Sequence, residues 1–258
     1  MREIRYLLMD PTANRTILVE TPTPVDEQPS LAAALMAAEP TAEQVGFLTR
    51  DDLSVVSLRM AGGEFCANAT MSAAAVLAMR TRLISGAVKV CVSGAEEPVE
   101  VDVTMQADGL WQGVVHLPPP RAIDDVSFAD GQTRPVVSFD GIVHVIEPQP
   151  IERPKAEALA RSRCAELSAD ALGLMFWDRA AGTLTPLVYV PKADTLYWEN
   201  SCGSGTAAVG AYLAHETGKP MTLTLHQPGG TLEIAANPDG EIRLKGTVKC
   251  LYERIKMM

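Results

Sequence analysis

Two of the five cysteines stand where they could transfer protons. Cys66 and Cys202 each lie in a turn of small residues, directly before an Ala-rich stretch whose composition predicts a helix. A helix N-terminus carries roughly half a positive charge and several unpaired N–H groups, which lower the pKa of a thiol and can hold a carboxylate. These residue types in these positions indicate proton transfer at a carbon next to a carboxylate.

A pair of thiols suits one reaction in particular. If both helix starts face the same substrate, one thiolate removes the proton of the α-carbon and the opposite thiol donates a proton to the other face, which inverts the stereocentre. The two thiols must begin in opposite protonation states, as coupled neighbouring groups do. Cys91, Cys164 and Cys250 are interpreted as structural thiols, because five widely spaced cysteines without a C-x-x-C pair predict neither a disulfide framework nor a zinc site.

The two cysteines occupy matching places in an internal repeat. Each half contains, in one order, a strand ended by prolines, an Ala/Leu-rich helix, a strand opened by glycine, the cysteine turn with its helix, and further strands. The matched stretches are 16–20 with 142–147, 31–39 with 155–167, 46–48 with 173–176, 88–92 with 221–225, and 99–103 with 232–234. The repeat predicts an α+β fold of two pseudo-symmetric domains, each a strand-rich, barrel-like layer around a central helix.

The connection between the halves is expected at three prolines, Pro118 to Pro120, and the polar stretch that continues to Thr133. If the halves pack about a pseudo-two-fold axis, the N-termini of both central helices face one cleft.

Composition excludes several classes of partner. The chain has 258 residues, with 22 Lys and Arg against 32 Asp and Glu and a formal net charge of −10, which argues against nucleic acid or an anionic membrane surface. No apolar run reaches the roughly 18 residues of a membrane span, and the first residues lack the apolar region of a secretory signal, so we expect a cytoplasmic protein. No dinucleotide or phosphate-loop motif, no argued lysine site for PLP and no metal-ligand spacing among His116, His215 and His226 is present, so no cofactor or metal is expected.

Five stretches resemble the diaminopimelate epimerase family, the PLP-independent racemases that use two cysteines. The stretches are 14–19, 43–47, 64–72, 198–206 and 226–230. Within the family they most closely resemble the histidine racemases of staphylopine-type metallophore biosynthesis. The resemblance implies a homodimer and two domains whose last strand returns to the first, giving 1–118 plus 247–258 with Cys66, and 119–246 with Cys202.

The resemblance also implies roles for residues of both halves. Cys66 and Cys202 match the catalytic acid/base pair. The positions that match substrate-cleft and carboxylate-binding residues of the family are Asn14, Gln44, Asn68, Gly203, Ser204 and Gly205. Ala67 stands where the family has glycine and where the backbone approaches the ligand.

The substrate is expected to be an amino acid, with interconversion of L- and D-histidine as the leading hypothesis. Diaminopimelate epimerases hold the distal carboxylate with a Glu-Arg pair before the second cysteine, but the stretch 192–198 contains no arginine. Another α-amino acid, or a non-catalytic amino-acid-binding protein on the same fold, is the alternative, and a purely structural protein is a more distant one.

Three further residues have two interpretations each. Glu43 and Glu199 are candidates for binding the imidazole or the ammonium group of a substrate, although Glu199 could instead cap the following helix. His144 lies in a strand of apolar residues, where it contacts either the substrate or the buried core.

Overall fold

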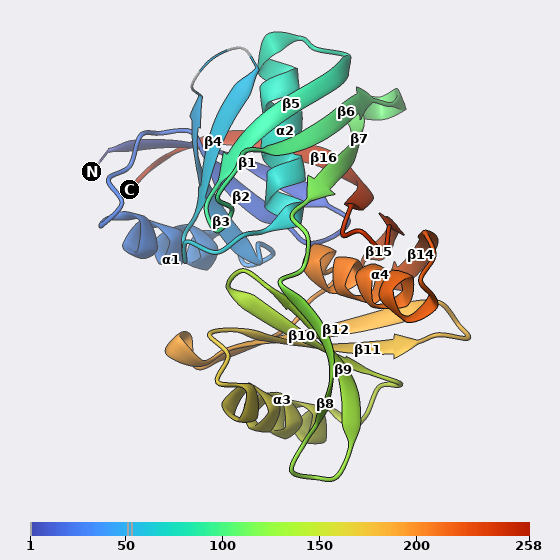
Figure 1. Ribbon diagram of the computed structural model, residues 1–258. Helices are drawn as coiled ribbons and strands as arrows, with labels where there is room; N and C mark the ends of the chain where they lie inside the picture. Colours follow the sequence, from blue (N-terminus) through green and yellow to red (C-terminus); the bar gives the residue numbers. More distant parts are fainter. Residues whose placement is uncertain (1, 51, 53) are drawn as a thin grey trace. The chain divides into compact units, whose positions relative to one another are not determined.

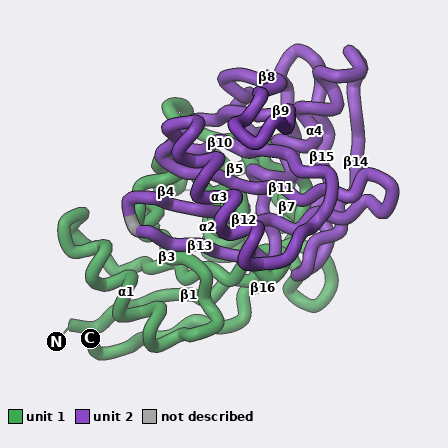
Figure 2. The backbone as a smooth tube through the Cα atoms, turned by 90° about the horizontal axis from the view of Figure 1, so that it is seen from below, with its two compact units in different colours: residues 1–116, 245–258 green, residues 117–244 purple. Residues whose placement is uncertain are grey.

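Two Ala-rich helices of 15 residues, α2 (Ala67–Thr81) and α4 (Gly203–Thr217), are the centres of two units in the computed structural model. The structure describes residues 2–50, 52 and 54–258. Unit 1 comprises Met1–His116 and Lys245–Met258, and unit 2 comprises Leu117–Leu244, shown in separate colours in Figure 2. Most residues of both helices are buried, 12 of 15 in α2 and 10 of 15 in α4, because small residues such as Ala and Gly allow strands to approach closely from several sides.

In unit 1, strands surround α2 in the order β1 to β7 followed by β16, and β1 also pairs with β16, so the eight strands form a closed barrel (Figure 1). The strands are β1 (Glu3–Pro11), β2 (Thr16–Val19), β3 (Gln44–Arg50), β4 (Val55–Met60), β5 (Ser85–Val92), β6 (Val99–Met105), β7 (Leu110–Leu117) and β16 (Ile242–Met257). Helix α1 (Gln28–Ala38) packs on the barrel at β3, and a short turn of 3-10 helix, η1 (Ala107–Gly109), precedes β7.

Unit 2 has a similar succession of strands around α4. Its strands follow the order β15, β14, β12, β11, β10, β9, β8, and β13 pairs with β12. They are β8 (Ala122–Ser127), β9 (Thr133–Phe139), β10 (Ile142–Glu147), β11 (Leu172–Asp178), β12 (Thr183–Val190), β13 (Thr195–Trp198), β14 (Met221–Gln227) and β15 (Gly230–Ala236). Helix α3 (Arg153–Leu167) packs on β11 and β12, and the 3-10 turn η2 (Pro191–Ala193) leads to β13.

The pairing pattern of the two units is the same. In unit 1, β2 is parallel to β3 and β4 is parallel to β5, with α1 and α2 as the crossovers. In unit 2, β10 is parallel to β11 and β12 is parallel to β14, with α3 and α4 as the crossovers. The predicted α+β fold of two similar, strand-rich halves around a central helix is therefore confirmed.

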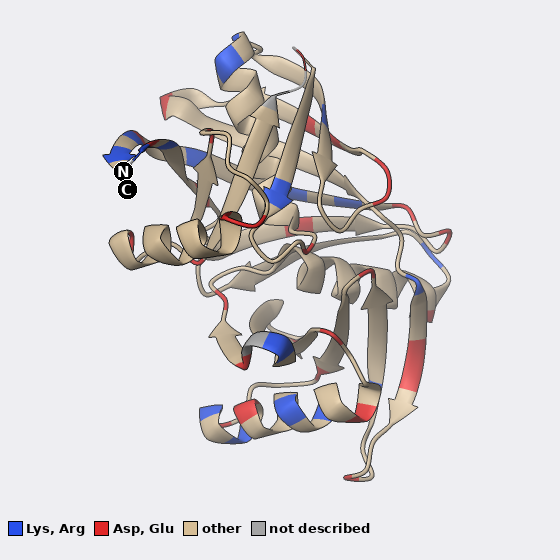
Figure 3. Cartoon of the chain, turned by 90° about the vertical axis from the view of Figure 1, so that its left-hand side faces the viewer, with Lys and Arg blue, Asp and Glu red and all other residues tan. Residues whose placement is uncertain are grey.

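Charge distinguishes α3 from the two central helices. Figure 3 shows α3 banded with both signs of charge, while α2 has Arg80 and α4 has Glu216 as their charged residues. An outer helix keeps one face in water, whereas a helix surrounded by strands keeps little of its surface there. The charges of α3 thus fit its place on the outside of unit 2, whereas the other outer helix, α1, has no charged residue.

One sequence prediction about the connection is wrong. The stretch from Pro118 to Thr133 is not a connecting segment throughout, because residues 122–127 form β8, which pairs with β9 along its whole length. Two adjacent aspartates, Asp124 and Asp125, are exposed on this strand and gave the stretch its polar, linker-like composition.

The final strand is fixed to unit 1 by side chains as well as by its backbone. The carboxylate of Glu39, at the end of α1, accepts hydrogen bonds from the hydroxyls of Tyr6 and Tyr252 at 2.6 Å each and from Arg254 at 2.8 Å. Burial and this carboxylate raise the pKa of Tyr6 to about 12. Among the described residues, no helix combines the length and apolar character needed to cross a membrane.

Candidate active site

Both cysteines cap the central helix of their unit. The Cys66 Sγ accepts the backbone N–H of Ala69 at 3.4 Å, and the Cys202 Sγ accepts that of Gly205 at 3.3 Å. Sulfur thus takes the role that a Ser or Asp oxygen usually has at a helix start. The predicted position of both thiols at helix N-termini is what the structure shows.

Threonine residues fix both caps from within the helix. Thr70 donates its hydroxyl hydrogen to the Cys66 carbonyl at 2.8 Å, and Thr206 does the same to the Cys202 carbonyl at 2.7 Å. The threonine four residues after each cysteine is therefore explained: it ties the first turn of the helix to the capping residue.

In unit 1, four residues predicted from the sequence form one hydrogen-bonded chain. The Cys66 thiol donates to the Gln44 Oε1 at 3.2 Å, the Gln44 Nε2 donates to the Asn14 Oδ1 at 2.6 Å, and the Asn14 Nδ2 donates to the Glu43 Oε2 at 2.8 Å. Gln44 also donates to the Thr16 hydroxyl at 2.8 Å. These contacts fix which amide atom of Gln44 faces the thiol.

In unit 2, a residue that the sequence interpretation did not select supports the second cysteine. The Gln227 Oε1 accepts the backbone N–H of Cys202 at 2.8 Å, and its Nε2 donates to the Thr206 hydroxyl at 2.8 Å. Gln227 is buried at the end of β14. The sequence could have indicated Gln227, because it lies in the family-like stretch 226–230. Its contact with Cys202 could not be predicted, because the two residues are 25 positions apart and meet only in the folded unit.

The pKa of Cys202 differs from the sequence expectation. A helix N-terminus lowers a thiol pKa, but burial of Cys202 outweighs this effect, and the charge of Glu199 and its hydrogen bond to the thiol act in the same direction. Hydrogen bonds from Ser204 and the Gly205 amide lower the pKa, yet the pKa of Cys202 stays well above its usual value. At neutral pH Cys202 is therefore a thiol, suited to donate a proton.

Glu199 does not cap the helix, since Cys202 occupies the N-cap position of α4. It comes directly after β13, and its backbone N–H donates to the Pro186 carbonyl at 3.1 Å. Its carboxylate acts on the Cys202 thiol instead.

The first turns of the two helices present matched residues. Ala67 and Gly203 are the first helical residues, and Asn68 and Ser204 are the second. All but Ser204 are buried. Gly205 has no room for a side chain, because a Cβ there would lie 2.0 Å from the Met175 Sδ and 3.2 Å from the Cys202 Sγ. The predicted carboxylate-binding residues thus occupy the turn that offers helix N–H groups.

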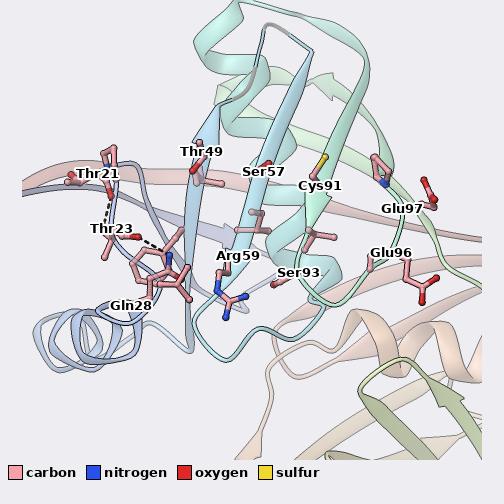
Figure 4. A pocket seen from close by; sticks show the side chains of 18 residues that line it. Thr21, Thr23, Gln28, Thr49, Ser57, Arg59, Cys91, Ser93, Glu96 and Glu97 are labelled. Atoms are coloured by element: carbon pink, nitrogen blue, oxygen red, sulfur yellow. Dashed lines mark hydrogen bonds between the residues drawn. The ribbon is translucent and has the colours of Figure 1, made fainter.

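One surface pocket lies apart from these residues. It has a volume of about 540 Å³ and lies in unit 1, lined by residues of β3, β4 and β5 and by the loops 21–28 and 95–98 (Figure 4). Thr21, Thr23 and Gln28 lie at one side and Glu96 and Glu97 at the other, with Arg59 between them (Figure 4). None of its lining residues is a predicted site residue, so the pocket gives no support to the proposed chemistry.

One side-chain cluster was not foreseen from sequence spacing. The ligand atoms of Glu100, Asp102 and His116 lie within 4.8 Å of one another on β6 and β7, with the His116 Nε2 3.0 Å from the Asp102 Oδ2. The three residues meet because Val101 pairs with Val115, a register that the sequence does not reveal. They are largely exposed, His116 and Asp102 are already hydrogen-bonded to each other, and exposed acidic groups of this kind are common without an ion.

Comparison with known families and proteins gives a consistent result. A family model described as the histidine racemase CntK N-terminal domain matches residues 3–252. A histidine racemase of Staphylococcus aureus strain Mu50 is 30% identical over 256 residues, covering 95% of this chain and 93% of that protein. A histidine racemase of Fusobacterium nucleatum strain ATCC 23726 is 30% identical over 257 residues, with 96% and 95% covered.

Solved structures support the fold at lower sequence identity. A structure described as a predicted epimerase from Pseudomonas aeruginosa has a TM-score of 0.73 at 16% identity and covers 99% of each chain. A hydroxyproline epimerase from Agrobacterium vitis, solved with trans-4-hydroxy-L-proline, has a TM-score of 0.69 at 12% identity and covers 99% of this chain and 91% of that one.

Proposed function

This chain belongs to the histidine racemase family of isomerases, and we propose that it interconverts L- and D-histidine by a two-cysteine mechanism that needs no cofactor. One observation carries the mechanism: each unit caps its buried central helix with a cysteine whose sulfur accepts the third N–H of that helix. A fold alone has no need of a thiol at both places, since serine or aspartate caps helices better.

The proposed reaction begins with Cys66 as thiolate and Cys202 as thiol. Cys66 removes the α-proton, Cys202 donates its proton to the opposite face of the carbon, and the enzyme is left with the reverse protonation states. The raised pKa of Cys202 supports this assignment for the resting enzyme. The Gln44 Oε1, 3.2 Å from the Cys66 sulfur, accepts the thiol hydrogen while Cys66 is protonated, and as part of a neutral amide it opposes the Cys66 thiolate less than a carboxylate would.

We assign the α-carboxylate of the substrate to the first turns of α2 and α4. Charge that develops on this carboxylate when the α-proton leaves is stabilised by N–H groups already in place, which is the largest contribution in many enzymes. Ala67, Asn68, Gly203 and Ser204 are the residues of these turns.

Histidine is proposed as substrate because of the family and because of the missing arginine. Side-chain recognition is assigned to Glu43, whose carboxylate is held by Asn14 in the same hydrogen-bonded chain that reaches Cys66. A carboxylate can accept the N–H of an imidazole, whereas a second carboxylate on the substrate would be repelled.

A homodimer and a cytoplasmic location complete the proposal. All five cysteines are free, as is usual in a reducing compartment. Light scattering on the purified protein would give twice the monomer mass for a dimer.

Chiral chromatography tests the substrate. The purified protein is incubated with each common L-amino acid and with diaminopimelate, without added cofactor, next to Cys66→Ser and Cys202→Ser variants. We expect D-histidine to accumulate to equal amounts with L-histidine, and neither variant to produce it. Racemisation of another amino acid but not histidine would overturn the substrate, and absence of any racemisation would favour an amino-acid-binding protein.

A further inference from the structure

We propose that His144 is a positioning residue for Cys202, and that it acts through the Ser204 hydroxyl to hold a hydrogen-bond donor toward the Cys202 sulfur. This inference rests on the proposed function, in which Cys202 is one of two catalytic thiols. It concerns residues of unit 2 alone.

Three side chains form a continuous chain of contacts. The Ser204 Oγ lies 3.6 Å from the Cys202 Sγ, and the His144 Nε2 lies 3.0 Å from the same Ser204 oxygen. Ser204 belongs to the first turn of α4, while His144 comes from β10. The contact therefore joins a strand of the sheet to the helix N-terminus that carries the cysteine.

The surroundings of His144 determine which nitrogen carries the hydrogen. The ring is completely buried, and among the described residues its Nδ1 has no hydrogen-bond partner. Nδ1 packs directly on Gly173, where a Cβ would lie 2.3 Å away, so this edge of the ring has no room for a partner. A buried N–H without an acceptor is rarer and more costly than an unused lone pair, so the hydrogen belongs on Nε2.

This tautomer gives every hydrogen bond a direction. The His144 Nε2–H donates to the Ser204 oxygen, and the Ser204 O–H is then directed to the Cys202 sulfur. Burial lowers the pKa of His144 to about 3, so the ring is neutral and keeps this single N–H throughout the working pH range.

Unit 1 shows that the fold does not require a histidine here. Leu18 pairs with Gly46 in β2 and β3 as His144 pairs with Gly173 in β10 and β11, and Asn68 occupies the helical position of Ser204. A leucine fills the buried place without the cost of desolvating an imidazole. The His144–Ser204 pair is therefore a feature of the Cys202 half, which makes the two thiols chemically different.

The pair counteracts the groups that keep Cys202 protonated. Glu199 is the charged side chain that acts on this thiol, and together with burial it favours the S–H form. After the thiol has given its proton to the substrate carbon, the Ser204 O–H stabilises the sulfur anion. No proton passes along the chain, since the hydrogens of His144 and Ser204 stay on their nitrogen and oxygen.

Titration of the Cys202 thiolate tests this role without any substrate. Absorbance at 240 nm is followed against pH for the full-length protein and for His144→Leu, Ser204→Ala and His144→Gln, each corrected with the same protein carrying Cys202→Ala. We expect His144→Leu and Ser204→Ala to move the Cys202 midpoint about one pH unit upward, which is about a tenfold loss of thiolate at fixed pH. His144→Gln can place an N–H near the Nε2 position, so its Cys202 midpoint should lie close to that of the unchanged protein.

A double variant separates this role from simple packing. His144→Leu combined with Ser204→Ala should move the midpoint no further than Ser204→Ala alone, because the histidine acts only through the serine. Additive shifts, or an unchanged midpoint in Ser204→Ala, would overturn the proposal even if His144→Leu fails to fold. If the midpoint shifts as expected but the protein racemises no amino acid, the positioning role of His144 stands and the proposed function is wrong. If the protein racemises histidine but the midpoint does not shift, the proposed function stands and the positioning role is wrong.

Discussion

The Cys66 sulfur lies 3.2 Å from the Oε1 of Gln44, and the amide of Gln44 is fixed by Asn14 and Thr16 on its other side. A carboxamide in this place accepts the hydrogen of a thiol but carries no charge that opposes a thiolate. The group near Cys202 that accepts the thiol hydrogen is instead the carboxylate of Glu199. The two cysteines thus have equivalent backbones and different chemical surroundings.

Gln44→Glu is expected to impair the enzyme through charge alone. A carboxylate at this distance disfavours the Cys66 thiolate, so kcat/KM for L-histidine should fall about tenfold or more at neutral pH and recover at higher pH. The measurement is the pH profile of kcat/KM. Gln132→Glu adds the same charge on an exposed loop and serves as the control, which should match the unchanged protein. A Gln44→Glu profile equal to the control would remove the role given to Gln44.

Glu199→Gln should act in the opposite sense on the second thiol. Removing the charge lowers the pKa of Cys202, so the alkaline limb of kcat/KM, where Cys202 loses its proton before reaction, should move to lower pH. Glu216→Gln, at the far end of α4, is the matched control. An alkaline limb that stays in place in Glu199→Gln would show that this limb does not report Cys202.

Gly205→Ala should lower stability as well as activity. The new methyl group would lie 2.0 Å from the Met175 sulfur, so the methionine must move out of a packed core. We expect a loss of about 1–3 kcal/mol and a decrease of several degrees in Tm, measured by calorimetry. A Tm equal to that of the unchanged protein would contradict the tight packing of Met175 against Gly205.

Acid should destabilise the protein partly through His144. The folded pKa is about 3, whereas an unfolded histidine has a pKa near 6.5, so between these values the unfolded chain binds more protons. The free energy of unfolding therefore falls as the pH decreases through this window, by up to about 1.4 kcal/mol per pH unit. Urea unfolding at pH 7 and pH 5 should show a smaller acid loss for His144→Leu than for the exposed control His215→Leu, and equal losses would contradict the buried, neutral ring.

Alkali should destabilise it through Cys202. Its folded pKa is raised, so above a pH of about 8.5 the folded chain retains a proton that the unfolded chain releases. The free energy of unfolding then decreases as the pH rises, and Cys202→Ser should flatten this decrease. Urea unfolding at pH 7.5 and pH 9.5 makes the comparison. A slope unchanged by Cys202→Ser would place the thiol outside the buried environment.

The sequence was sufficient for features that repeat and insufficient for those that depend on register. Equivalent places for Cys66 and Cys202 could be predicted because small residues, a threonine and an Ala-rich helix follow both. The contact of Gln227 with Cys202, and the meeting of Glu100 and His116, depend on strand pairing that one residue of slippage would abolish. The raised pKa of Cys202 could not be predicted either, because burial opposes the helix N-terminus and its extent is a property of the folded unit.

Histidine racemisation in D₂O tests the two-cysteine mechanism most directly. L-Histidine is added to the protein in D₂O, and α-deuterium in both enantiomers is followed from the first turnovers by NMR and chiral chromatography. With a separate donor for the second face, the D-histidine formed should carry deuterium while the remaining L-histidine keeps its proton, and Cys66→Ser and Cys202→Ser should each abolish racemisation. D-Histidine that retains the original proton, or racemisation that survives either substitution, would contradict the mechanism.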